Sequence, residues 1–412
     1  MLSADFLKRY DFDWEIMDVV IGGRSAVDSR NALRLPSISE AEQFLDCYGY
    51  NSENPIEKAE LFGNFQEALS FIRRTFLKPD NPDGIRGEIP KKITEVTDIG
   101  QLLIIASSNN AELSRWACSV IKVMHTISHM DKDLRTHYFT DIQTQILDRV
   151  YKYVHSENEQ VYLGRDIRDP DRVDLVLFDS KPKKKRDSVL LKLLHKPENV
   201  AEDIFDRVGI RFVTKNKYDG LRVIKFLKER YVIMPANIKP SRSRNTLVNV
   251  PEFQRELDRL LSEAATQKWS ASDMDRRLIE FCESPAAIPE SAKRDSENAY
   301  SSQYYRSIQF TARQLIKFRN TLYDDVRELK NLVKTSTVPE EVAKITERLD
   351  LRNIQKEIRF FYPFEVQVYD EVSHRDSIAG MSAHSAYKKA QIQAAMRRVM
   401  GELAERESTP HA

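Results

Sequence analysis

The first third of the chain has the hydrophobic periodicity of amphipathic helices. Between residues 1 and about 155, apolar side chains recur every three or four positions in AEQFLDCY, FQEALSFIRRTFL, AELSRWACSVIKVMHTI and FTDIQTQILDRVYKYV. Strand-like runs are nearly absent from this part, and one proline-rich stretch, LKPDNPDGIRGEIP, interrupts the helices. The pattern predicts an all-helical N-terminal domain over residues 1–155.

The pattern changes at Arg172, where short β-branched and aromatic runs begin to alternate with helical segments. Strands are predicted at RVDLVLF, GIRFVT, YYRSIQFTAR and FYPFEVQVY. Helices are predicted at SVLLKLLHK, at YDGLRVIKFLKER and from about 386 to 406. Because strands and helices mix irregularly, residues 156–412 are expected to form a second domain of the α+β class, built on a mixed sheet.

Two longer polar stretches interrupt this second domain. The first covers about 250–300 and includes PEFQRELDRLLSEAA and ASDMDRRLIEFCE, and the second covers about 320–358. Both place apolar residues at helical spacing between many charged ones. We expect helical insertions, which would form a lid, a partner surface or an autoinhibitory cover.

Composition indicates an ordinary globular protein. The chain has 412 residues, of which 41% are hydrophobic and 31% charged, enough for two or three domains with cores of their own. Its 64 basic and 63 acidic residues nearly cancel, so that any basic binding site must be local.

Cysteine usage and hydropathy predict a cytoplasmic protein with no membrane partner. The three cysteines lie far apart and form no CxxC pair, which favours a reducing compartment. No stretch approaches the roughly 20 apolar residues of a membrane span. The start, MLSADFLKRYDFDWE, lacks the apolar segment of a signal peptide.

A basic run, KPKKKR at residues 181–186, leads directly into a predicted helix. Ser188 and Lys192 are four positions apart and share one face of this helix, while Lys184 precedes its start. Such a run is either a solvated loop or a contact for polyphosphate or nucleic acid. Cations that converge on a helix N-terminus suit a triphosphate.

Two carboxylates stand at or in predicted strands. Asp206 precedes GIRFVT, in which Arg211 follows five positions later, and the two residues form either a salt bridge or part of a Mg²⁺ site. Glu365 lies inside the otherwise apolar run FEVQVY, where a carboxylate needs a partner, a metal or a cleft. Two carboxylates on neighbouring strands, facing a basic helix start, suit Mg²⁺-dependent phosphoryl transfer.

Other catalytic signatures are absent from the sequence. His125 and His129 are spaced like a metal pair, but no third ligand is identifiable, and ordinary packing or surface histidines are the favoured interpretation. The chain has no HEXXH, P-loop, G-x-S-x-G or G-x-G-x-x-G motif, which removes the usual support for zincin, P-loop, α/β-hydrolase and Rossmann proteins.

Four blocks in the second half resemble the (p)ppGpp synthetase domain of RelA/SpoT-type proteins. EVQVYDEVSHRDSIAGMSAHSAYKK, at residues 365–389, is similar without a gap to that family's EIQIRT…MH…AE.GVAAHW.YK block. DRVGIRFV resembles its D-I-x-x-x-R-V-[IV], YYRSIQF its G-Y-x-S-[LI]-H, and KKKRDSVLLK its R-x-K-x-x-x-S-x-x-x-K. The order of the blocks is also the family's order.

The resemblance implies a mixed, nucleotidyltransferase-like sheet and transfer of the ATP pyrophosphoryl group to the 3′-hydroxyl of a guanine nucleotide. It implies that Asp206 and Glu365 hold Mg²⁺, and that Glu365 also orients or deprotonates the hydroxyl. The phosphates of ATP would be bound by Lys184, Ser188, Lys192 and Arg211. The acceptor would be bound by Tyr305, through stacking, and by Ser307, Gln309, Gln367 and His374.

The chain departs from the family mainly around the acceptor. Pro182 replaces an Arg, Tyr304 a Gly, Gln309 a His, Tyr369 an Arg and Ile378 a Glu. This suggests a changed acceptor, such as an adenine nucleotide or the 3′ end of tRNA, or an inactive nucleotide or RNA sensor with the same fold. No histidine is followed by Asp, so the (p)ppGpp hydrolase activity of bifunctional members is not expected.

Overall fold

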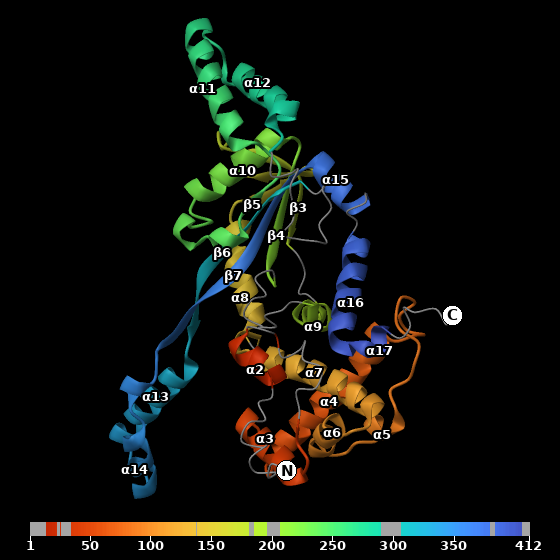
Figure 1. Ribbon diagram of the computed structural model, residues 1–412. Helices are drawn as coiled ribbons and strands as arrows, with labels where there is room; N and C mark the ends of the chain where they lie inside the picture. The colour runs from red at the N-terminus through yellow and green to blue at the C-terminus, as the bar shows by residue number, and fades with distance from the viewer. Residues whose placement is uncertain are drawn as a thin grey trace, which may run out of the picture.

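A sheet joins a helical body to two projecting pairs of helices in the computed structural model (Figure 1). The structure describes residues 14–22, 25, 34–136, 138–180, 185–195, 207–289, 306–379 and 384–405. The helical body lies at the bottom of Figure 1 and the sheet lies above it. Within the described residues, no helix has both the length and the apolar character needed to cross a membrane.

Polar side chains determine where several helices of the helical body begin. Ser37, Asn54, Asp98 and Asn110 each accept a backbone N–H from the first turn of the helix that follows. The helices are α2 (Trp14–Ile21), α3 (Ile38–Tyr48), α4 (Pro55–Phe76), α5 (Lys91–Thr94), α6 (Ile99–Ala106) and α7 (Ala111–Asp131).

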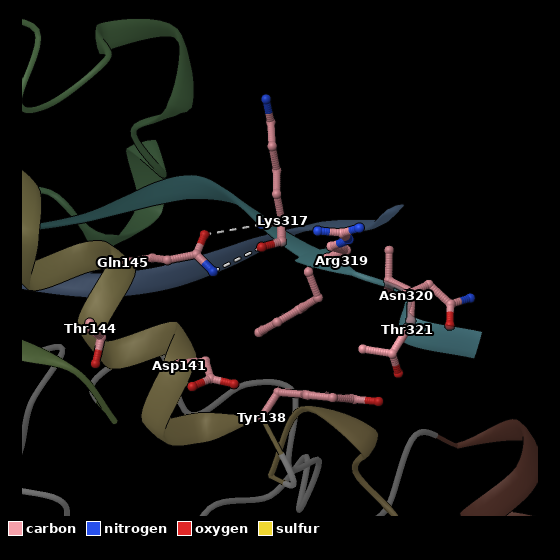
Figure 2. Close-up of a pocket in the computed structure, with 10 residues that line it drawn as sticks. Tyr138, Asp141, Thr144, Gln145, Lys317, Arg319, Asn320 and Thr321 are labelled. Carbon is pink, nitrogen blue, oxygen red and sulfur yellow. Dashed lines mark hydrogen bonds between the residues drawn. The ribbon is translucent and has the colours of Figure 1, made fainter. Parts of the chain in front are cut away.

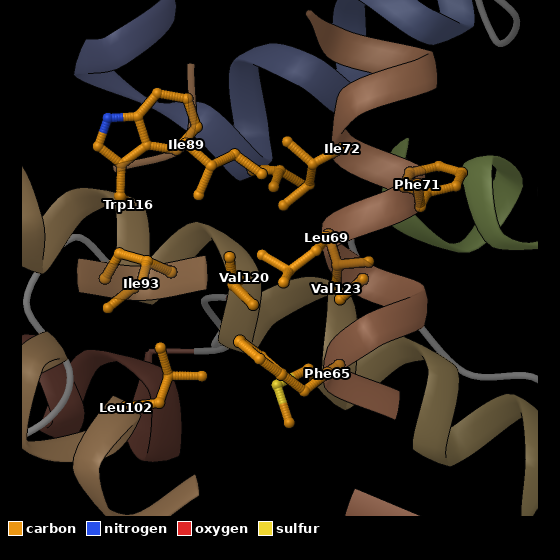
Figure 3. Packing of buried hydrophobic residues seen from close by; sticks show 14 of the residues in the cluster. Phe65, Leu69, Phe71, Ile72, Ile89, Ile93, Leu102, Trp116, Val120 and Val123 are labelled. Atoms are coloured by element: carbon orange, nitrogen blue, oxygen red, sulfur yellow. The ribbon is translucent and has the colours of Figure 1, made fainter. Parts of the chain in front are cut away.

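The core of the helical body is built from both ends of the chain. Figure 3 shows its centre, where Phe65 and Leu69 of α4 lie near Val120 and Val123 of α7. Three later helices complete this core: α9 (Arg186–His195), α16 (His384–Met400) and α17 (Glu402–Glu405). The helical body therefore depends on one helix that lies between strands of the sheet in the sequence and on two that follow its last strand.

The described strands form one mixed sheet of seven strands in the order β1-β2-β3-β4-β7-β6-β5. The parallel pair is β4–β7, and the other neighbours are antiparallel. The strands are β1 (Val154–Glu157), β2 (Gln160–Leu163), β3 (Val173–Ser180), β4 (Gly209–Thr214), β5 (Arg244–Asn245), β6 (Ile308–Arg319) and β7 (Glu357–Asp370).

One face of the sheet is apolar and is covered by two helices. Ile210 and Phe212 of β4 and Val366 of β7 pack with apolar residues of α8 (Phe139–Tyr151) and α10 (Lys217–Glu229). This second core is separate from that of the helical body. It fixes the register of the central strands, because a shift by one residue would turn their apolar side chains to the other face.

The two insertions are also helical, and a further helix follows β7. The first insertion contains α11 (Val250–Gln267) and α12 (Ala271–Glu283), and the second contains α13 (Thr321–Thr335) and α14 (Glu340–Arg348). A short helix, α15 (Glu371–Ala379), follows β7 directly. Single 3₁₀ turns lie at Leu134–Thr136, Pro235–Asn237, Pro240–Arg242, Pro285–Ala287 and Leu351–Asn353.

The predicted mixture of helices with a mixed sheet is confirmed, and each of the four predicted strands is present as β3, β4, β6 or β7. The hairpin β1–β2 and helix α15 were not predicted. The nucleotidyltransferase-like fold and the domain boundary at residue 155 stay predictions. The two cores cross that boundary, because α8 packs on the sheet while α9, α16 and α17 pack into the helical body.

Candidate functional site

The central strand β7 has a row of polar side chains inside the sheet. Val366 and Val368 belong to the apolar core. Because side chains alternate along a strand, Glu365, Gln367 and Tyr369 point to the opposite face. These three residues, called the polar row below, are only 7%, 5% and 2% exposed. A carboxylate buried in this way needs polar partners.

Two amide groups donate hydrogen bonds to the carboxylate of Glu365. Gln367 Nε2 donates to Oε2 at 2.9 Å, and Gln309 Nε2 donates to Oε1 at 2.5 Å. Gln309 lies on β6, directly opposite Gln367. The hydroxyl of Tyr369 donates to Gln367 Oε1 at 3.4 Å, which orients that amide with its N–H groups toward Glu365. Both oxygens of the buried carboxylate therefore have a polar partner inside the sheet.

Arg211 places a cation beside the polar row. It lies on β4 opposite Gln367 in the parallel pair. Its Nη1 is 3.5 Å from His374 Nε2 on α15 and 3.9 Å from Asp179 Oδ2 on β3, and its guanidinium carbon is 5.8 Å from the centre of the Tyr369 ring. Nε of Arg211 is buried, and the described residues offer it no hydrogen-bond partner. One N–H of the guanidinium is therefore left without a hydrogen-bond partner among the described residues.

His374 is brought to the site by the turn from β7 into α15. Burial lowers the pKa of His374, the cation of Arg211 lowers it further, and Asp179 acts in the opposite direction. The imidazole is therefore neutral at pH 7, and its Nε2 can accept a hydrogen bond from Arg211 Nη1. The ring also meets Tyr369 edge-on, with 5.8 Å between the ring centres.

Ser307 lies close to these residues, and its backbone groups are hydrogen-bonded to Thr246. Its N–H donates to Thr246 Oγ1 at 3.0 Å, and its carbonyl accepts the N–H of Thr246 at 2.9 Å. Only 2% of Ser307 is exposed. These bonds fix where β6 starts, and so they help to place Gln309 opposite Gln367.

Helix α9 carries the predicted phosphate contacts Ser188 and Lys192, and it is attached to the helical body. Its main packing partners are α7 and α16, and both residues are half-buried. At the start of the helix, Arg186 binds Asp131 at 2.6 Å and Glu67 at 2.5 Å. The charge of Arg186 is thus already compensated by two carboxylates, and the phosphate contacts of Ser188 and Lys192 stay predictions.

Three predicted site residues, Lys184, Asp206 and Tyr305, lie outside the described residues. The structure brings Glu365, Gln367, Gln309, Arg211 and His374 together, from three strands and one helix. Among the described residues, no three His, Cys, Asp or Glu side chains are close enough to form a metal site. Of the two carboxylates predicted to hold Mg²⁺, Glu365 lies among the described residues and Asp206 does not.

Sequence reasoning missed two charged residues near the site. Asp179 is the partner of Arg211 across β3 and β4; its position near the end of a predicted strand, just before the basic run, was the available signal. Arg207 is only 7% exposed, and it binds Thr136 at 3.0 Å and Asp133 at 3.5 Å. Its neighbours come from the linker between α7 and α8, which no local pattern reveals.

The histidine pair in α7 belongs to a separate cluster in the helical body. The hydroxyl of Tyr48 and Nδ1 of His125 are 2.5 Å apart, and the rings of His125 and His129 are 4.3 Å apart. Burial lowers the pKa of His125 to about 4, with a smaller contribution from His129. A neutral histidine bound to a tyrosine agrees with the favoured interpretation, ordinary packing.

A surface hollow of about 540 Å³ lies between α8 and the far end of β6 (Figure 2). Tyr138, Asp141 and Gln145 line it from α8, and Lys317 and Arg319 line it from β6. Gln145 bridges the strand, since its amide binds both the carbonyl and the N–H of Lys317. The lining includes no residue of the polar row, so this hollow is not part of the candidate site.

Comparison of the chain with protein-family models, with curated proteins and with solved structures finds no match.

Proposed function

We propose that this chain transfers the pyrophosphoryl group of ATP to the 3′-hydroxyl of a guanine nucleotide or a related acceptor, with Mg²⁺. The supporting observation is that a buried carboxylate, Glu365, lies beside a cation, Arg211, on the adjacent strand. Nε of Arg211 has no hydrogen-bond partner among the described residues. The RelA/SpoT resemblance assigns these two positions to catalysis and to ATP. A reaction of this type needs positioned reactants and cations more than it needs covalent catalysis.

In the proposed reaction, the acceptor's 3′-oxygen forms a bond to the β-phosphorus of ATP. The bond from that phosphorus to the oxygen bridging the α- and β-phosphates breaks, which releases AMP. Glu365 orients the attacking hydroxyl and accepts its proton. Arg211 binds the phosphate oxygens, with Lys184, Ser188 and Lys192 as further contacts.

Magnesium fits the donor set that the resemblance implies. Mg²⁺ is usually bound by one or two carboxylates together with substrate phosphates and water. Glu365 supplies one carboxylate, and Asp206 is the second by sequence resemblance. The ion would neutralise the charge of the phosphates during transfer.

The acceptor would lie along the polar row. Gln309, Gln367 and His374 offer amide and imidazole groups that can bind a nucleobase or a ribose, and Tyr305 would stack on the base. Neutral donors and acceptors of this kind select by hydrogen-bond pattern. A guanine nucleotide is the first acceptor to test, and the 3′ end of tRNA is a related one.

The test is transfer from ATP labelled on its β-phosphate, with Mg²⁺ and with GDP, GTP, ADP and bulk tRNA as parallel acceptors. Glu365→Gln keeps the shape of the side chain and removes its charge, and we expect it to reduce the rate at least 100-fold. Glu357→Gln is the matched control, because Glu357 lies on the same strand and is paired with Arg359 at its outer end.

A labelled product that forms with wild type and Glu357→Gln, and is lost with Glu365→Gln, supports the proposal. The lane that contains the product identifies the acceptor. Product formation that is unchanged by Glu365→Gln contradicts the assigned role. Absence of product in every lane contradicts the proposed reaction.

One observation favours a second candidate, an inactive nucleotide or RNA sensor. Both oxygens of Glu365 already accept amide N–H bonds from Gln309 and Gln367, so the carboxylate has structural partners without any substrate. For a sensor, ATP or GTP binds in calorimetry and no labelled product forms. Arg211→Gln then weakens binding, whereas Glu365→Gln leaves binding nearly unchanged.

A further inference from the structure

A pair of short helices projects from the far end of the β6–β7 ribbon (Figure 1). We call residues 320–356, which contain α13 and α14, the helical arm. The chain leaves β6 at Arg319 and returns in β7 at Glu357, and these two residues are paired. The helical arm is therefore a hairpin, in which α13 runs outward and α14 runs back. Among the described residues, the main packing partners of α13 are α14 and the 3₁₀ turn at 351–353.

The helical arm has very little core of its own. Val326 is the buried residue of α13, and Thr346 is the buried residue of α14. The helices have 15 and 9 residues, and isolated helices shorter than about 12–15 residues are marginal in water. Helices of this length are normally stabilised by packing an apolar face against something else.

The apolar face of the helical arm is exposed. The side chains are aliphatic, they come from both helices, and their exposed fractions are 56% for Leu322, 36% for Leu329, 52% for Leu332, 38% for Val342 and 58% for Ile345. Successive residues of a helix are about 100° apart around its axis. Around that axis, each of the five exposed side chains lies about 40–120° from the buried residue of its own helix, and the direction of rotation is the same for all five. In an antiparallel pair this rotation puts both sets on one side of the hairpin.

The charges of the helical arm are arranged so that it complements itself. Residues 320–356 contain seven acidic and seven basic side chains, so two identical arms do not repel each other through net charge. In α13, Asp324, Asp325 and Glu328 occupy the first half, together with one Arg, and Lys330 and Lys334 occupy the second half. An antiparallel partner with the same sequence sets acidic halves against basic halves.

We propose that a second copy of this chain covers the apolar face, with the two helical arms packed antiparallel about a two-fold axis as a four-helix bundle. A two-fold interface uses the same surface on both copies. Helix α13 can face its own copy in this way, because it has no net charge and its acidic half meets the basic half of the other copy. The proposal is independent of the chemistry proposed for the polar row.

The size of the face sets the expected strength. A helix of 15 residues is about 22 Å long, and two helices side by side are about 20 Å wide. Such a face covers about 440 Å² on each copy, or about 900 Å² for the two copies together. This total is typical of weak, transient interfaces, so we expect a reversible dimer with a dissociation constant in the micromolar range.

Sedimentation velocity of the full chain between about 1 μM and 300 μM tests this. We expect a shift from monomer to dimer with concentration in the wild type. Leu332→Glu combined with Ile345→Glu is expected to weaken the dimer at least 100-fold, since two charges per copy enter the interface. Ile56→Glu is the matched control, because Ile56 is 77% exposed on α4 in the helical body.

A cross-link provides a second readout that does not depend on weakening the protein. Leu329 lies near the middle of α13, so a two-fold antiparallel arrangement brings Leu329 close to its own copy. In a chain with the exposed Cys47 replaced by Ser, Leu329→Cys is expected to form a disulfide-linked dimer under mild oxidation, and Ile56→Cys is not. A wild type that is monomeric throughout, or a dimer that persists in the double variant, overturns the proposal.

Discussion

Two buried carboxylates of this chain are stabilised in different ways. Burial acts to raise the pKa of Asp169, but hydrogen bonds from the backbone and side chain of Arg165 outweigh this effect and lower it. Glu365 instead accepts its bonds from neutral amides, with Arg211 on the neighbouring strand. Asp169 has the partners of a structural ion pair. Glu365 keeps a nearby cation that can bind a substrate, which is typical of a functional site.

The first prediction at the residue scale concerns His125. Its pKa is lowered to about 4 in the folded chain, against about 6.5 when unfolded. Between these values the unfolded state binds the proton more readily, so the free energy of unfolding falls as the pH falls from about 6.5 to about 4. The loss is at most about 3 kcal/mol. Urea unfolding at several pH values measures it.

His125→Asn is the comparison for this prediction, because Asn offers an acceptor to the hydroxyl of Tyr48 but does not titrate in this range. Its stability is expected to fall less on acidification than that of the wild type. Parallel curves for the two proteins would show that His125 does not cause the acid sensitivity.

At the scale of single elements, α9 links the sheet domain to the helical body. Leu190 and Leu194 are fully buried in the helical core, and the carbonyl of Leu194 accepts a hydrogen bond from Arg398 of α16 at 2.8 Å. Since α9 follows β3 in the sequence, its packing fixes how the chain passes from the sheet into the helical body.

We predict that Leu194→Ala lowers the free energy of unfolding by about 2–5 kcal/mol, since it leaves a cavity in a packed core. Ile56→Ala, at an exposed position on α4, is the control and is expected to change stability by less than about 0.5 kcal/mol. Chemical denaturation followed by circular dichroism gives both values. Equal effects of the two substitutions would contradict the assignment of α9 to the core.

Local sequence patterns predicted the strongly periodic elements and missed those that depend on tertiary contacts or on special backbone angles. β4 was predicted from GIRFVT, and its bounds agree with the prediction. The hairpin β1–β2 was missed because its turn, Asn158–Glu159, has positive φ angles of 49° and 65° without a glycine. Such turns usually carry Asn-Gly, so Glu159 concealed the signal.

The candidate site could be predicted only in part, because local patterns reveal single residues and not the partners that the fold brings to them. Glu365 stood out as a carboxylate inside an apolar strand, and Arg211 and Gln309 followed from the resemblance. Asp179 and Arg207 were not found, because their partners lie on elements distant in the sequence. The attachment of α9 to the helical body could not be predicted either. The spacing of Ser188 and Lys192 shows that they share a helix face, but it does not show what the helix packs against.

At the scale of the whole molecule, the end of the chain completes the helical body. Ser119 of α7 donates to the carbonyl of Val399 at 3.1 Å, and Arg115 pairs with Glu402 at 2.5 Å. Apolar residues of α16, including Met396 and Met400, lie in the same core as α4 and α7. The sequence-based division at residue 155 separates these contacts.

We predict that a chain ending at residue 383 has no stable helical body, because it lacks α16 and α17. Limited proteolysis and thermal melting are expected to show cleavage within residues 34–136 and loss of cooperative unfolding. Replacing residues 321–356 with a short turn is the control, and it should leave these residues protected. A truncated chain that melts like the full one would contradict the prediction.

The position of α16 in the helical core has a consequence for synthesis on the ribosome. About 250 residues separate the end of α7 from the start of α16, and at about 5–20 residues per second they take roughly 10–50 s to translate. During that interval, the apolar surface that α16 later covers is open to other nascent chains. Efficient production is thus expected to require slow expression or chaperone capacity.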